Sequence, residues 1–215
     1  MPQIKHHLTD NLLLAYAAGT LPEAFNLVIA THVSLCDDCR AALAAFEVLG
    51  GEVLDDAEPA TVDKTSLAAT LALIARGDRA EDPPRTIPSG VFPAPLQDRI
   101  GGDLADVRWR RIGGGVSQAV LPTSARASVR LLRIPAGARV PDHGHRGLEL
   151  TLVLQGAFRD DSDRFGPGDI EVADESMIHQ PVAEAGQECI CLSATDAPLR
   201  FRRLLPRIAQ SFLRI

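Results

Sequence analysis

The stretch GARVPDHGHRGLELTLVLQG, residues 137–156, carries three side chains of the kind that bind metal ions. His143, His145 and Glu149 all occupy odd-numbered positions. Because side chains alternate between the two faces of a β-strand, residues of the same parity project to one side of a sheet. In a closed barrel, that side can be the interior. The stretch therefore predicts a metal site inside a β-barrel.

A second segment, RFGPGDIEVADESMIH at residues 164–179, adds a Pro167-Gly168 turn and then a third histidine, His179. Three imidazoles and one carboxylate suit zinc, iron, manganese, nickel or copper, and the ligand types do not choose among these metals. The simpler alternative is a barrel with polar interior side chains and no metal. The presence of all four ligands favours the metal site.

These two segments resemble the two sequence motifs of the cupin superfamily. The first segment matches the first motif at all of its defining positions, which are Gly137, His143, His145, Glu149 and Gly156. The second segment resembles the second motif, although Ala183 stands where that motif usually has its terminal asparagine. The resemblance implies a jelly-roll barrel with a metal on His143, His145, Glu149 and His179.

The second half of the chain has the pattern of an all-β domain, which we assign to residues 98–215. Its short runs of β-forming residues are separated by Gly, Pro and Asp at the spacing of a sandwich or barrel. Cys189 and Cys191 in one of these runs, ECICLSA, are two positions apart and so share a strand face. Such a pair is a candidate redox reporter, although most buried strand cysteines are inert.

The first part of the chain, residues 1–77, has a helical pattern. Thr9 is a candidate N-cap for a first helix that stops at Gly19. Thr20 followed by Glu23 is a capping-box pattern for a second helix, which runs up to Cys36.

Two further helices complete this predicted unit. The third is expected from Asp38 to the pair Gly50-Gly51, and the fourth, capped by Asp63, is expected to carry an apolar stripe of Leu67, Leu71 and Ile74. Residues 78–97 are rich in proline and acidic residues and are predicted to be a flexible linker. The predicted fold class is therefore α+β with two domains, a small all-α four-helix domain followed by a cupin barrel.

The helical part contains a second group of metal ligands in HVSLCDDC, residues 32–39. His32 and Cys36 lie on one face of a helix, and Cys39 follows one turn later. A structural zinc site needs four ligands, and His6 and His7 are the available candidates for the fourth, of which we prefer His7. The alternatives are a redox-active C-x2-C pair and buried cysteines with no metal.

The set His7, His32, Cys36 and Cys39 resembles the zinc signature of the anti-sigma domains that inhibit group IV (extracytoplasmic function) sigma factors. The combination of this domain with a C-terminal cupin resembles the ChrR-type anti-sigma factors over essentially the whole chain. The resemblance implies zinc at both sites, a 1:1 complex with a group IV sigma factor, and release of that sigma factor by singlet oxygen or related oxidants. It also implies that the helical domain suffices for inhibition.

Composition restricts the remaining classes of function. The chain has 215 residues, of which 46% are hydrophobic and 23% charged, and its net charge is −6. An acidic chain of this kind is a poor candidate for a nucleic-acid binder. The absence of a signal peptide pattern or a long apolar run predicts a cytoplasmic protein with no membrane segment. The rival hypothesis is a metal-dependent cupin enzyme, such as a dioxygenase or isomerase, with a helical accessory domain.

Overall fold

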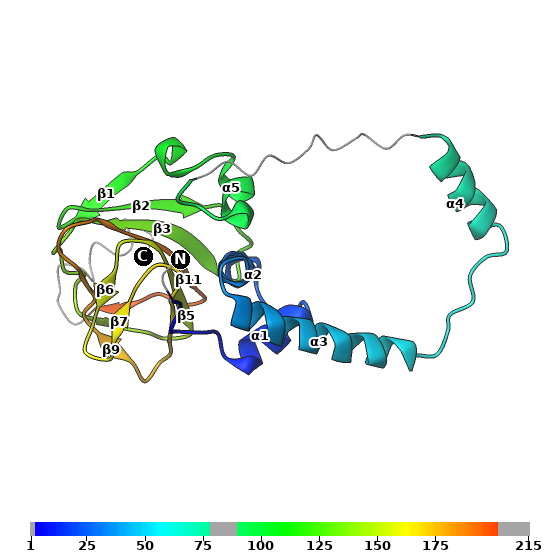
Figure 1. Cartoon of the computed structure of the whole chain (residues 1–215), viewed down its shortest axis with the longest axis horizontal. Coiled ribbons are helices and arrows are strands. Elements are labelled where there is room, and N and C mark those ends of the chain that lie inside the picture. Colours follow the sequence, from blue (N-terminus) through cyan, green and yellow to red (C-terminus); the bar gives the residue numbers. More distant parts are fainter. Residues whose placement is uncertain (1–2, 78–89, 202–215) are drawn as a thin grey trace.

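The computed structural model describes residues 3–77 and 90–201 (Figure 1). Within these ranges a helical part precedes a β-rich part, as the sequence predicts. The helical part has five α-helices in place of the expected four, and a short 3-10 helix, Leu104–Asp106, follows them. No helix of the described ranges is both long enough and apolar enough to cross a membrane.

The first two helices lie near their predicted positions. Helix α1 (Asp10–Ala17) begins after Thr9, whose side chain accepts a hydrogen bond from the backbone of Leu12, so the predicted cap is confirmed. Helix α2 (Glu23–Val33) has Pro22 at its N-cap. The predicted capping box is wrong, because the Thr20 hydroxyl donates to the carbonyl of Ala15.

The third helix, α3 (Asp37–Asp55), is longer than predicted. Gly50 and Gly51 do not end it, and the helix continues for another turn beyond them. A glycine costs a helix only about 1 kcal/mol relative to alanine, which is too little to terminate a helix that both flanks favour. The second half of α3 extends away from the body of the molecule (Figure 1).

Helix α4 (Ser66–Ala75) contains the predicted stripe, but none of its residues is buried. Its Leu67 is 71% exposed and its Ile74 is 70% exposed. The side chain of Asp63 accepts hydrogen bonds from Thr65 and makes no N-cap bond to the helix, which corrects the predicted cap. Figure 1 shows α4 far from the rest of the described chain.

Helix α5 (Ala94–Ile100) begins inside the predicted linker and was not expected from the sequence. Pro93 occupies its N-cap and Gly101 ends it in the left-handed conformation, with φ of 77°. Most of the predicted linker, residues 78–89, lies outside the described residues. Helix α5 packs against α2.

The β part contains three antiparallel sheets. The large sheet has the order β1-β2-β3-β11-β5-β8, and the small sheets have the orders β10-β6-β7 and β12-β4-β9. The strands are β1 (Arg110–Gly113), β2 (Val116–Leu121), β3 (Ser128–Ile134), β4 (His143–Gly144), β5 (Glu149–Gln155), β6 (Phe158–Arg159), β7 (Arg164–Phe165), β8 (Ile170–Ala173), β9 (Ile178–His179), β10 (Val182–Ala183), β11 (Cys189–Thr195) and β12 (Arg200–Phe201).

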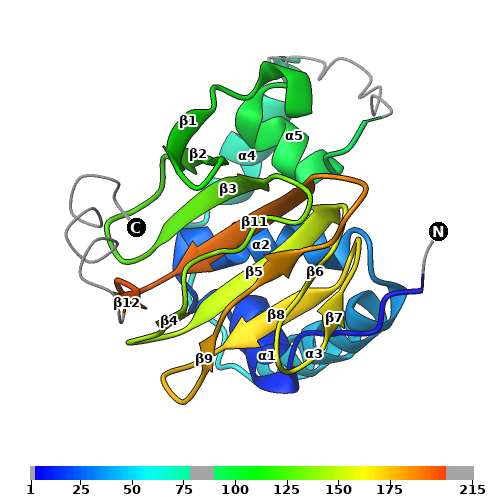
Figure 2. The same ribbon diagram turned by 90° about the vertical axis from the view of Figure 1, so that its left-hand side faces the viewer.

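The helical part and the β part share one apolar core. Helix α2 packs against β11, β5 and β3 of the large sheet. Alternate residues of β11, Ile190 and Leu192, join the cluster that includes Phe25 and Ile29 of α2. Each such side chain that is fully buried contributes about 1.5–3 kcal/mol to stability. The two parts are therefore packed together, in contrast to the flexible tether expected from the linker, and Figure 2 shows the helices behind the large sheet.

Candidate metal centres and the link between them

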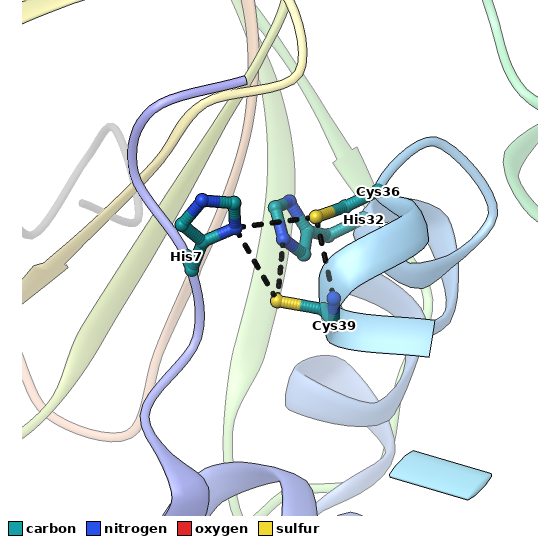
Figure 3. A group of neighbouring side chains, drawn as sticks. All are labelled: His7, His32, Cys36 and Cys39. Carbon is teal, nitrogen blue, oxygen red and sulfur yellow. Dashed lines mark hydrogen bonds between the residues drawn. The ribbon is translucent and has the colours of Figure 1, made fainter. Parts of the chain in front are cut away.

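The first candidate site joins three separate segments of the helical part (Figure 3). His32 lies in the last turn of α2, Cys36 is the N-cap of α3, and Cys39 lies in the first turn of α3. His7 comes from the extended segment before α1. One ligand atom from each of these four residues lies within 4.8 Å of all the others.

The distances fit a tetrahedral metal ion. His7 Nδ1 lies 3.2 Å from Cys36 Sγ and 3.8 Å from Cys39 Sγ, and His32 Nε2 lies 3.3 Å from Cys39 Sγ. Bond lengths of about 2.0–2.1 Å to nitrogen and about 2.3 Å to sulfur, at the tetrahedral angle, place N and S about 3.6 Å apart. The observed values bracket that separation, so a zinc-sized ion fits among the four atoms.

The protonation of His32 also suits a ligand. Burial lowers the pKa of His32 to about 4, so its imidazole is neutral at physiological pH. Its Nδ1 lies 3.0 Å from the carbonyl oxygen of Gly168, which only accepts, so Nδ1 carries the proton. The lone pair of Nε2 then points towards Cys39.

The thiol of Cys39 requires a cation to ionise at neutral pH. Burial raises the pKa of Cys39 to about 11, because a thiolate is poorly solvated there. A bound metal ion deprotonates a coordinating thiol outright. The same burial makes Cys39 a poor candidate for the reactive, low-pKa thiol of a C-x2-C redox site.

Of the two candidate histidines, the structure places His7 beside the thiols and turns His6 away. The ring of His6 lies 3.1 Å from Asp163 and 3.5 Å from Asp169, both in the β part. The backbone N–H of His6 also donates to Asp169, at 3.0 Å. His6 therefore holds the N-terminal segment on the barrel.

The second candidate site is a group of three buried imidazoles inside the β part. His179 Nε2 lies 3.2 Å from His143 Nε2 and 3.3 Å from His145 Nε2. A metal with bonds of about 2.0–2.1 Å to nitrogen places its ligand nitrogens about 3.3 Å apart at the tetrahedral angle. His143 and His179 face each other across the β4–β9 pair, which explains why their rings meet.

Glu149 adjoins this triad, with Oε2 3.6 Å from His145 Nδ1. It lies on β5 of the large sheet, whereas His143 lies on β4 of a small sheet. The sequence predicted that the ligands share one side because they have the same parity along a strand. That reason was wrong, because His143 and Glu149 lie on different strands. The three histidines come together, whereas Glu149 lies beside the ring of His145 and outside this close group.

Two carboxylates that were not predicted from the sequence contact His179. Asp160 Oδ2 and Glu171 Oε1 each lie 3.0 Å from His179 Nδ1. Burial disfavours the imidazolium, but the hydrogen bond and charge of Glu171 outweigh it and raise the pKa of His179 to about 9 in the metal-free site. In a metal site the same carboxylates fix the proton on Nδ1 and leave Nε2 to bind. Glu171 could have been found from its acidic side chain inside an apolar strand, IEVA.

Cys189 and Cys191 are buried free cysteines, and their sulfur atoms lie 3.5 Å apart. Cys191 lines a cavity of about 380 Å³ that also contains His143 and His179. The hydrogen bond with the thiol of Cys189, together with burial, raises the pKa of Cys191, which makes it a poor nucleophile.

Four consecutive residues connect the two candidate sites. Gly168 accepts from His32 of the first site, and Asp169 Oδ1 accepts from the backbone of Lys5 and His6, at 2.6 and 3.0 Å. The backbone N–H of Ile170 donates to His6, at 3.3 Å. Glu171 contacts His179 of the second site. We call residues 168–171 the connecting segment.

A helical part with a His/Cys site, packed on a β part with a histidine triad, is the architecture expected of an anti-sigma domain joined to a cupin. The family model of the ChrR Cupin-like domain matches residues 97–197. The chain is 58% identical to the anti-sigma-E factor ChrR of Cereibacter sphaeroides over 212 residues, 99% of each chain. It also resembles a crystal structure of Rhodobacter sphaeroides SigE in complex with the anti-sigma ChrR, with 57% identity and a TM-score of 0.80 over 90% of this chain and 100% of that one. The chain belongs to the ChrR family of anti-sigma factors.

Proposed function

We propose that this protein is a cytoplasmic anti-sigma factor that binds a group IV sigma factor one to one and keeps it from RNA polymerase. Membership of a family of regulators, together with the relative seen in complex with SigE, favours this role over that of a cupin enzyme. The observation that carries the proposal is a large exposed apolar surface in the helical part.

This apolar surface consists of two parts that lie apart in Figure 1, one on the outer half of α3 and one on α4. Its members are the large apolar residues that are more than half exposed in these two helices: Val48, Leu49, Val53, Leu54, Leu67, Leu71, Leu73 and Ile74. Monomeric proteins rarely expose so many large apolar side chains together, and such surfaces mark protein–protein interfaces. No residue of α4 is buried, so its apolar side chains are accessible to a partner.

The test is to mix the purified chain with the group IV sigma factor of the same organism and measure their association. We expect a 1:1 complex by light scattering and loss of sigma-dependent transcription from a defined promoter. A chain that elutes alone and leaves transcription unchanged would contradict the proposal.

We infer zinc at His7, His32, Cys36 and Cys39, and zinc or another divalent transition metal at His143, His145, Glu149 and His179. Two thiolates and two imidazoles are the ligand set of closed structural zinc sites. Three imidazoles and one carboxylate leave coordination positions for a small molecule. When bound, the second metal would supply a Lewis-acidic centre inside the barrel.

The second site is proposed to sense singlet oxygen or a related oxidant. The connecting segment offers the route by which a change there reaches the helical part, because Glu171 touches His179 while Gly168 touches His32. A rearrangement of the ligands would shift β8 and so alter the docking of the N-terminal segment. Cys189 and Cys191 are candidate redox residues in the same barrel, subject to their burial.

Changing His143 or Glu149 to alanine is expected to abolish oxidant-triggered release while sigma binding stays within about 3-fold of the wild type. These residues lie in the barrel, away from the apolar surface. The measurement is the fraction of sigma factor released when a photosensitiser is illuminated. Normal release from both variants would show that the cupin metal is not the sensor.

Changing Asp169 to alanine is expected to uncouple the two sites. Burial opposes ionisation of Asp169, but backbone hydrogen bonds from Gly166, Lys5 and His6 outweigh it and lower its pKa, so its carboxylate is charged and holds the N-terminal segment. We expect both metals and sigma binding to be retained, and oxidant-triggered release to fall at least about 5-fold.

The matched control is Asp161→Ala, which removes an exposed carboxylate from the neighbouring loop. It should release sigma factor like the wild type. If Asp169→Ala releases sigma factor as fast as Asp161→Ala, the connecting segment carries no signal.

A further inference from the structure

A row of polar residues crosses the large sheet on the side that lines the cavity of the barrel. Arg130 of β3 pairs in register with Ser193 of β11, Ser193 pairs with Thr151 of β5, and Thr151 pairs with Glu171 of β8. All four residues line the cavity of about 380 Å³. The row leads from Glu171, which supports His179, to the guanidinium of Arg130 at the other end.

Arg130 is a buried cation whose hydrogen-bond partners are neutral. Only 5% of the residue is exposed. Its guanidinium donates to Ser128 Oγ at 3.1 Å and, over a long 3.5 Å, to Gln118 Oε1. Within residues 3–77 and 90–201, no carboxylate oxygen lies within the 4.0 Å of an ion pair with it. Burial lowers the pKa of Arg130, and the charge of Glu149, which acts without direct contact, partly offsets this effect. Because a buried charge is costly unless it is paired, the guanidinium still favours an anion in direct contact.

The acidic residues of the cavity are committed elsewhere. Glu149 accepts from the Thr151 hydroxyl at 3.0 Å and lies beside His145. Glu171 binds His179. Neither carboxylate satisfies the guanidinium directly, which leaves its remaining N–H groups for a molecule that enters the cavity.

The rest of the wall sets the character of such a molecule. Apolar side chains from both faces of the barrel, among them Val116, Leu132, Val140 and Phe158, line the cavity. Its volume falls at the lower end of the range for small-molecule sites. Arg139 also lines the cavity but is exposed, so Arg130 is the buried cationic anchor of a small, largely apolar chamber.

We propose that the barrel binds a small organic monocarboxylate with an apolar body, its carboxylate paired with Arg130. A planar guanidinium matches a carboxylate bidentately, and the pair is strengthened by the low dielectric of the cavity. The apolar body of the ligand fills the chamber towards the histidine triad. This assignment does not depend on the anti-sigma proposal, because it concerns the free chain.

The test is titration calorimetry of the full chain with octanoate, octan-1-ol and octylamine. A charged hydrogen-bonded pair contributes about 1.5–3 kcal/mol, so octanoate should bind at least about 10-fold more tightly than octan-1-ol, and octylamine should bind most weakly. In Arg130→Gln the affinity for octanoate should fall about 10- to 100-fold, while that for octan-1-ol stays within about 3-fold.

The matched control is Arg133→Gln, on the same strand, whose side chain is partly exposed and pairs with Glu188 outside the cavity. It should bind octanoate like the wild type. A second variant, Val116→Phe, fills the chamber and leaves Arg130 in place, so it should weaken octanoate and octan-1-ol alike. This variant decides the question if Arg130→Gln fails to fold.

Three results would overturn the assignment. The first is that the wild type binds neither octanoate nor octan-1-ol. The second is that Arg130→Gln, or Val116→Phe where Arg130→Gln does not fold, binds octanoate as tightly as the wild type. The third is that the preference for octanoate disappears when the metal is stripped with a chelator and persists in Arg130→Gln, since the carboxylate would then bind the metal.

Discussion

Replacing Cys36 and Cys39 together with alanine is expected to remove one zinc ion per chain and to weaken sigma binding at least about 100-fold. Cys36 and Cys39 lie at the start of α3, and a metal bound to them would tie that helix to α2 by His32 and to the N-terminal segment by His7. Without the metal, the orientation of α3 and its exposed half is lost. We also expect the unfolding temperature to fall by about 10 °C or more.

Metal content by mass spectrometry and affinity by calorimetry measure these effects. The matched control is Cys189→Ala/Cys191→Ala, which also removes two buried cysteines but leaves the helical part intact. It should keep the N-terminal zinc and bind sigma factor like the wild type. If the Cys36/Cys39 variant keeps its full zinc content, the site is not the one drawn in Figure 3.

Changing Leu67 and Leu71 to aspartate is expected to reduce sigma affinity at least about 100-fold without lowering the stability of the free chain. Both leucines lie on one face of α4, and they are 71% and 55% exposed. Because both side chains are more than half exposed in the free chain, a charge there removes little buried apolar surface and costs little folding energy. In an apolar interface the same charge would be desolvated without a partner.

The control variant adds the same charge to a different side of α4. Ala69→Asp/Ala72→Asp adds the same two carboxylates to the opposite side of α4. It should retain affinity within about 5-fold of the wild type, once the small loss of helix propensity is included. Equal weakening by both variants would indicate a general charge effect, and no weakening by either would place the interface elsewhere.

Local sequence patterns predicted most of the parts of both sites. The H-x3-C-x2-C spacing identified His32, Cys36 and Cys39 because helix geometry alone brings them to one end of α2 and α3. Alternation and turn residues located β3, β5, β8 and β11. Gly50 and Gly51 led to a wrong prediction of the end of α3. The low helix propensity of glycine is too small an effect to end a helix that both flanks favour.

Contacts between distant segments could not be read in the same way. The choice of His7 over His6 depends on Asp169, 163 residues from His6, which holds the N-terminal segment in one orientation. The support of His179 by Asp160 and Glu171 depends on three strands meeting inside the barrel. Because α2 packs on β11, the helical part and the β part share one core, although the linker suggested that they were separate.

The sequence by itself determined the ligand types, the helices and strands that carry them, and the order of the helical and β parts, because these follow from residue chemistry and from spacings of a few residues. The tertiary structure decided which histidine meets the thiols and that the connecting segment touches both sites. It also decided that Arg130 is a buried cation with no carboxylate in contact among the residues that the structure describes. These features arise from packing across the sheets, where residues far apart in sequence meet and no local periodicity records their partners.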